Sequence, residues 1–123
     1  EWPAHFPADC PPSDAQPATG AVYYLAHNPP TPDDWLSALE NGLFVTFPSC
    51  QRASLSCFLL PEQTEFLTRM PRHVGKVTLR AELSGEHGVA KRTGNRPGHH
   101  SVWFRRVWHA KLGELFSVPG ASP

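Results

Sequence analysis

A run of polar and aromatic residues late in the chain, HHSVWFRRVW over His99–Trp108, has the residue types that bind ligands and partners. We expect this run to form a strand, in which neighbouring side chains point to opposite faces. One face would then carry imidazole, hydroxyl, indole and guanidinium groups, from His99, Ser101, Trp103 and Arg105. Such a ladder is typical of a binding groove. The simpler alternative is an amphipathic strand with Trp103 half-buried and Arg105 stacked on it.

A groove needs a second wall, and the stretch Gly20–Glu40 is the candidate. It predicts a strand over Ala21–His27, a stiff proline turn over Asn28–Pro32 and a short helix that ends at Asn41-Gly42. The expected contact residues are Tyr24 and Trp35 from this unit, with His99, His100, Trp103 and Arg105 from the late strand. Aromatic and Arg side chains carry most of the binding energy at interfaces. The leading hypothesis is therefore a non-catalytic module that binds a protein or a small molecule. In it, alanine at Trp103 or Arg105 would weaken partner capture and barely change the melting temperature.

The sequence holds no complete catalytic or metal-binding motif. Its seven histidines include five scattered single residues, His5, His27, His73, His87 and His109, without HxH or HExxH spacing. We therefore expect no metal, because a site could form only where distant segments converge. GxSxG, P-loop and dinucleotide fingerprints are also missing, so no cofactor is expected.

Three cysteines, Cys10, Cys50 and Cys57, lack the CxxC spacing of a zinc site. A disulfide scaffold is not expected at this density, which makes a reducing, cytoplasmic setting the default. A single bridge from Cys10 to either Cys50 or Cys57 stays open as an alternative. Cys57 otherwise fits a buried core residue.

Eleven basic and eleven acidic residues cancel, which removes the broad positive surface of a nucleic-acid-binding protein. The basic residues nevertheless gather in the last third. A nucleic-acid surface would use Arg92, Arg96, Arg105 and Arg106, and its affinity would fall steeply with salt. No apolar run has the length of a membrane span, so no membrane partner is expected.

The pattern predicts an α+β fold with one compact domain over residues 20–118, a packed proline-rich arm over 1–19 and a tail over 119–123. Strands are expected over Ala21–His27, Leu43–Phe47, Ala53–Leu60, Lys76–Leu83, His100–Trp108 and Leu112–Val118, with a short one over Val89–Thr93 after a turn at Gly85 and Gly88. A second helix is expected over Pro61–Met70. The result would be a bent, mostly antiparallel sheet of about six strands with two short helices.

Several short motifs together resemble a family of small uncharacterised bacterial proteins. The motifs are Cys10-Pro11-Pro12, Gly20 with Tyr23, Pro29-Pro30-Thr31, Asp34-Trp35 with Ser37, Leu55-Ser56, and His99-His100 with Trp103. The resemblance spans most of the chain and brings no assigned activity. The chain begins with Glu rather than Met, as a trimmed chain or a piece of a longer one would.

A fainter resemblance is to ADP-ribosyltransferase-like folds. These place an Arg or His on the first strand, a Ser or Tyr on a middle strand before a helix, and a catalytic Glu on a late strand. The matching positions are Tyr24 or His27, then Ser56, then Glu114. This resemblance implies an alternative function as a transferase or toxin domain that uses NAD, with Glu114 stabilising an oxocarbenium-like state.

Overall fold

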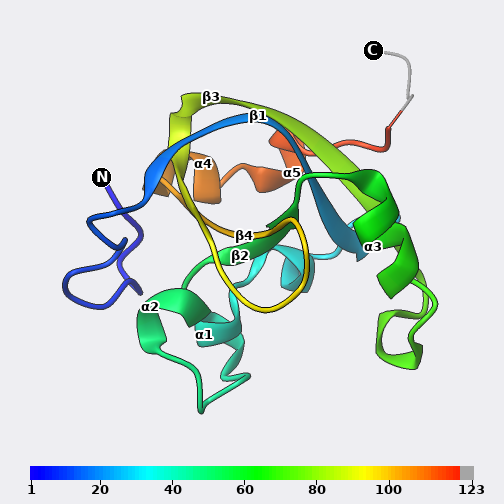
Figure 1. Cartoon of the computed structure of the whole chain (residues 1–123), viewed down its shortest axis with the longest axis horizontal. Helices are drawn as coiled ribbons and strands as arrows, with labels where there is room; N and C mark the ends of the chain where they lie inside the picture. The colour runs from blue at the N-terminus through cyan, green and yellow to red at the C-terminus, as the bar shows by residue number, and fades with distance from the viewer. Residues whose placement is uncertain (120–123) are drawn as a thin grey trace.

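A computed structural model describes residues 1–119. Within them, four antiparallel strands form the centre of the molecule. The strands are β1 (Gln16–His27), β2 (Leu55–Phe58), β3 (Lys76–Arg92) and β4 (His99–Phe104). They close into a barrel in the order β1-β2-β4-β3 (Figure 1). The prediction of one α+β domain with antiparallel pairing agrees with this arrangement. The prediction of an open sheet of about six strands is wrong.

Short helices lie in the connections between the strands and after β4. They are η1 (Pro32–Trp35), α1 (Ala38–Asn41), α2 (Ser49–Arg52), α3 (Pro61–Leu67), η2 (Pro71–His73), α4 (Arg106–His109) and α5 (Leu112–Leu115). The helix predicted over Pro61–Met70 is therefore present but shorter. Within residues 1–119, no helix has both the length and the apolar character needed to cross a bilayer.

The third strand is twice the length that the sequence predicts, because it bends where we expected a turn. Its first half pairs with β1, from His27↔Lys76 to Thr19↔Ser84, and its second half pairs with β4 and, at Val89 and Ala90, with the start of β1. Gly85 has φ +91°, a backbone angle that residues with a side chain rarely adopt. At Gly88, a Cβ atom would lie 2.1 Å from the carbonyl oxygen of Trp103 on β4. The two glycines thus let one strand serve both neighbours, as glycines at barrel corners do.

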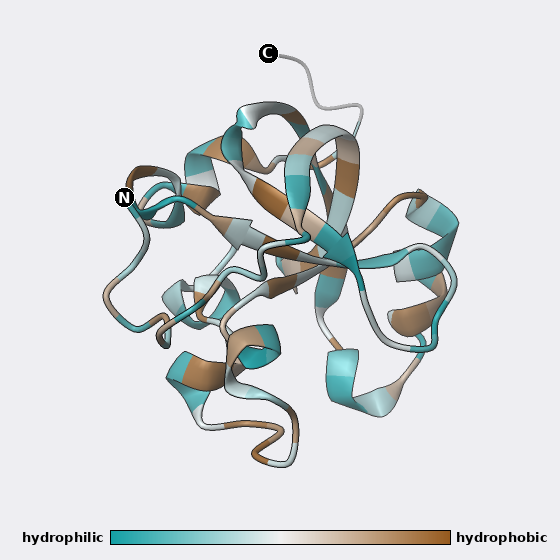
Figure 2. Cartoon of the chain, turned by 60° about the vertical axis from the view of Figure 1, so that its left-hand side comes forward, coloured by the Kyte–Doolittle hydropathy of each residue, from teal (hydrophilic) through white to brown (hydrophobic). Residues whose placement is uncertain are grey.

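Two predicted strands are absent. Leu43–Phe47 forms an irregular loop between α1 and α2, in which Phe44 has φ +53° and Val45 is 72% exposed. Figure 2 shows this apolar loop extending away from the barrel. The other predicted strand, over Leu112–Val118, begins instead as α5, where the spacing of four residues puts Leu112 and Phe116 side by side in the core.

The first strand begins inside the segment that we expected to belong to the arm. It starts at Gln16, and a register shift between Pro17 and Thr19 accommodates the proline, which cannot donate to the ladder. Several contacts hold the remaining arm against the rest of the domain. A disulfide joins Cys10 to Cys50, and the amide of Arg106 donates to the carbonyl of Glu1 over 2.8 Å.

Candidate functional site

The barrel is closed least completely between β1 and β2. These strands share a single residue pair, Tyr23↔Phe58, whereas β1 pairs with β3 along nearly its whole length. A hollow of about 370 Å³ lies beside this pair, between the first half of β1 and Leu59. It reaches the barrel interior, because core residues such as Val22 and Val102 line it.

The floor and the rim of this hollow differ in chemistry. The floor is apolar, with Ala18, Val22, Ala90 and Val102. The rim is polar, with Asp14, Lys91, Arg92 and His100 among its residues. Lys91 is paired with Asp14 at 2.9 Å, but within residues 1–119 no ion pair includes Arg92. The hollow therefore offers an uncompensated guanidinium at the edge of an apolar surface, which suits an anionic group attached to an apolar body.

Of the six predicted binding residues, only His100 lines this hollow. It shares the inner face of β4 with Val102 and Phe104, as the strand alternation predicts. Its Nδ1 lies 3.1 Å from the carbonyl oxygen of Gly98, a contact that orients the ring.

The predicted ladder of His99, Trp103 and Arg105 does not form a groove. Trp103 is only 1% exposed, and its Nε1 donates to the carbonyl oxygen of Cys50 over 2.8 Å. Arg105 stacks on Trp2 rather than on Trp103, with 4.7 Å from its guanidinium carbon to the ring centre, and pairs with Glu1. The arm and the disulfide segment therefore cover the outer face of β4. Arg105 holds the arm, and the buried Trp103 cannot meet a partner.

The residues expected on the opposite wall lie at a different place. Tyr24 packs between Trp35 and Phe116 against the barrel core, with ring centres 5.7 and 5.6 Å away. Its hydroxyl donates to the backbone carbonyl of Asp34, and burial raises its pKa well above the ordinary range. Since Tyr24 belongs to the inner cluster and Trp103 to the covered outer face of β4, the groove predicted between them is absent.

His99 is also part of the packing. Its ring meets Phe58 edge-on at 5.2 Å, and its Nδ1 lies 2.8 Å from the carbonyl oxygen of Thr93. Burial lowers the pKa of His99 and outweighs the raising effect of that contact. A neutral ring in this position fits a structural role.

The three residues matched to a transferase site do not come together. His27 ends β1 and pairs with Asp34, its Nδ1 2.9 Å from a carboxylate oxygen. Ser56 is exposed on β2, and Glu114 is exposed on α5, a helix rather than the late strand that the resemblance implies. Among the described residues, no hydrogen bond or ion pair joins any two of the three.

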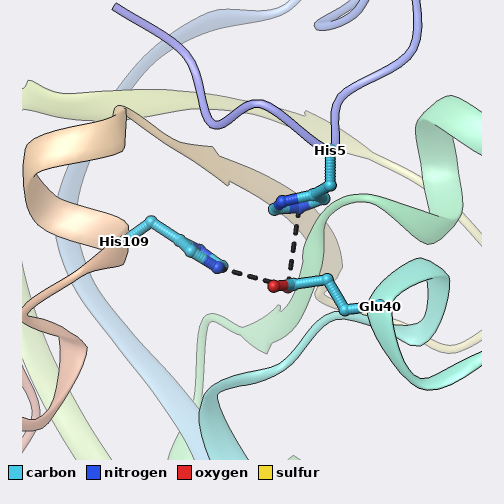
Figure 3. A group of neighbouring side chains, drawn as sticks. All are labelled: His5, Glu40 and His109. Carbon is cyan, nitrogen blue, oxygen red and sulfur yellow. Dashed lines mark ion pairs between the residues drawn. The ribbon is translucent and has the colours of Figure 1, made fainter.

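A cluster that sequence spacing could not reveal joins three distant segments. His5 from the arm and His109 from α4 both point at the carboxylate of Glu40 on α1 (Figure 3). The distances from Glu40 Oε1 are 3.5 Å to His5 Nε2 and 3.2 Å to His109 Nε2. The side chains are 16–22% exposed. Both histidines were counted as scattered single residues in the sequence, and only the fold brings them together.

Local structure fixes the carboxylate of this cluster. Ser37 and Glu40 form a capping box at the start of α1, in which the Ser37 amide donates to Glu40 Oε1 over 2.9 Å. Burial alone would raise the pKa of Glu40, but this hydrogen bond and the two histidines lower it. Burial also lowers the pKa of His5, with His109 acting in the same direction and Glu40 opposing. The expected state has an ionised carboxylate facing imidazole nitrogens.

The disulfide follows one of the two pairings that the sequence left open, from Cys10 to Cys50 or to Cys57. Cys10 and Cys50 are bridged, and Cys57 is a fully buried free thiol whose pKa burial raises to about 12.

Comparison of the chain with protein-family models, curated proteins and solved structures finds no match. The hollow and the His5, Glu40 and His109 cluster are therefore the features from which a function can be inferred.

Proposed function

We propose that this chain is a small binding module whose ligand carries an anionic group on an apolar body and occupies the hollow beside the β1–β2 pair. One observation carries the proposal. An apolar floor inside the barrel meets a rim on which the Arg92 guanidinium has no carboxylate partner among residues 1–119.

The size and composition of the hollow support this class of ligand. Its volume of about 370 Å³ falls within the range of pockets that bind small molecules, roughly 300–1,000 Å³. Apolar floor residues would supply affinity through surface removed from water. Arg92 would supply orientation, because a guanidinium binds a carboxylate through two parallel hydrogen bonds. The proposal keeps the predicted binding role of His100 and moves the site from the outer ladder to the barrel interior.

Decanoate is a suitable probe, since it combines a carboxylate with a flexible apolar chain. We would measure its displacement of a fluorescent anilinonaphthalene sulfonate from the intact chain. Arg92→Gln should weaken decanoate binding about 10–100-fold, the value of one charge-assisted hydrogen bond of roughly 1.5–3 kcal/mol. Arg72→Gln, at an exposed arginine outside the hollow, is the matched control. No displacement, or an equal loss in both variants, would reject the proposal.

The positions of the three matched residues do not favour a transferase. It needs Glu114, Ser56 and His27 around one dinucleotide, and no contact among the described residues supports that. Calorimetry with NAD provides the direct check, and we expect no binding heat.

The disulfide also bears on where the module works. The cytoplasmic expectation came from the cysteine count, and bridged cysteines are rare in the reducing cytosol. The Cys10–Cys50 bridge holds the arm over β4. We therefore infer that the bridged form functions in an oxidising compartment.

A further inference from the structure

The His5, Glu40 and His109 cluster has the donor atoms of a transition-metal site. Two imidazole Nε2 atoms and one carboxylate oxygen lie within 4.8 Å of one another. Imidazole nitrogen with carboxylate oxygen suits Zn²⁺, whereas Ca²⁺ and Mg²⁺ prefer oxygen alone. Two histidines and one glutamate are also a donor set of catalytic zinc sites, which leave the fourth position to water or substrate.

Two of the three donor spacings match tetrahedral coordination, and the third, between the ligand atoms of the two imidazoles, is at most 4.8 Å. Ligands bound to zinc at about 2.0–2.1 Å in a tetrahedron are separated by about 3.3 Å. The distances from Glu40 Oε1 to His109 Nε2 and His5 Nε2 are 3.2 and 3.5 Å, on either side of that value. Both imidazoles direct Nε2 toward the carboxylate (Figure 3), so an ion could be bound with small side-chain movements.

The surrounding structure holds each donor before any ion arrives. Glu40 is fixed by the capping box with Ser37, and His109 by its place in α4 directly after β4. The arm that carries His5 is tied by the Cys10–Cys50 bridge and by its contacts with Arg105 and Arg106. Ordering costs conformational entropy, so donors held in advance bind an ion more tightly.

One of the three atoms that could bind a metal has no hydrogen-bond partner in the described part of the chain. His5 Nε2 is buried and makes no hydrogen bond. Buried polar atoms in folded proteins are nearly always satisfied, and an exception points to a missing ion or water. A cation between the three side chains would accept the His5 lone pair and balance the charge of Glu40.

We propose that His5, Glu40 and His109 bind one Zn²⁺ ion, with a fourth coordination position open to solvent. The ion would join the N-terminal arm to α1 and α4. The site is separate from the proposed ligand hollow, because none of the three residues lines it.

Zinc titration of the chelator-treated, disulfide-bonded chain tests the proposal. Calorimetry should show one ion per chain, and His109→Gln should weaken binding more than about 100-fold, since changes to residues that merely support zinc ligands already cost 10–100-fold. Glu40→Gln should weaken it similarly while preserving the capping box, in which Gln also serves. His73→Gln is the matched control, as His73 lies in η2 outside the cluster. Absence of one-to-one binding, or an equal loss in His73→Gln, would overturn the proposal.

A second variant and a second readout guard against misfolding. His5→Gln changes the arm rather than the barrel, and its circular dichroism should match the parent chain while zinc affinity falls. Co²⁺ in place of zinc should give visible absorption that disappears in His5→Gln and persists in His73→Gln. Arg92→Gln should leave zinc binding unchanged, which separates this proposal from the ligand hollow. Unaltered cobalt absorption in a folded His5→Gln would exclude His5 as a ligand.

Discussion

Replacing both Cys10 and Cys50 by alanine opens a loop whose ends are 40 residues apart in the sequence. In the chain-entropy description, a bridge across such a loop restricts the unfolded state and stabilises the fold by about 4 kcal/mol at 25 °C. That is a large share of the roughly 5–15 kcal/mol that stabilises a typical domain. We expect the free energy of unfolding of the double variant to fall by a comparable amount.

Urea titration followed by tryptophan fluorescence measures this change. Trp103 is one of four tryptophans that contribute to the emission, and it lies under the bridged segment, where it donates to the carbonyl of Cys50. The total emission should shift to the red in the double variant as water reaches Trp103. The parent chain treated with reductant is the control, since it opens the same loop without substitution. The bridge would carry no such role if oxidised and reduced chains unfolded at the same urea concentration.

Thiol counting checks the pairing independently. The folded, oxidised chain should expose no reactive thiol, because the remaining Cys57 is fully buried and burial raises its pKa to about 12. Unfolding without reductant should release one thiol, and unfolding with reductant should release three. Labelling of Cys10 or Cys50 in the oxidised, unfolded chain would show that the pairing differs.

Three further substitutions test the packing. Asp34→Ala removes a carboxylate that accepts from the Thr31 amide at 2.7 Å and the His27 amide at 3.2 Å, and should cost about 1–3 kcal/mol in urea unfolding at pH 7. Burial would raise the Asp34 pKa, but these hydrogen bonds lower it. The contribution of Asp34 to the free energy of unfolding is therefore complete above the ordinary Asp pKa and is lost as pH falls through the lowered pKa. A difference in unfolding free energy between parent and variant that stays constant down to pH 2 would contradict this. Trp103→Ala should cost about 3–5 kcal/mol, contrary to a surface role, and a melting temperature close to that of the parent would refute burial. Gly88→Ala should destabilise by about 1–3 kcal/mol, because its Cβ would clash with the Trp103 carbonyl; normal stability would show that β3 and β4 are not so close.

Local signals predicted much of the secondary structure. Alternation in Lys76–Leu83 placed Leu79, Ala81 and Leu83 correctly in the core. Glycine after the α1 segment ends it as expected, with Gly42 at φ +68°. These features depend on neighbouring residues, so the sequence contains the information.

Predictions failed where tertiary contacts decide the outcome. Gly85 and Gly88 look like turn residues in sequence, and only the close approach of Trp103 explains why β3 continues through them. Trp103 is a residue type that is common at binding sites. It is covered, however, by an arm held by a disulfide that the sequence could not assign.

The candidate sites were hidden for the same reason. His5, Glu40 and His109 come from the arm, α1 and α4, and no spacing rule connects such segments. The ligand hollow exists because β1 and β2 pair only at Tyr23↔Phe58, and strand composition does not reveal how few pairs two strands share. His100 was among the predicted binding residues, but the groove was expected on the opposite face of its strand, so the sequence did not place it at this hollow.

Amide chemical shifts of the isotopically labelled chain during a decanoate titration show where the ligand binds. We expect saturable shifts gathered around Val22, Arg92, His100 and Val102, which surround the hollow. Non-specific binding of an apolar chain would instead favour the exposed loop at Leu43–Phe47. Shifts confined to that loop, or no saturable shifts at all, would contradict a ligand site inside the barrel.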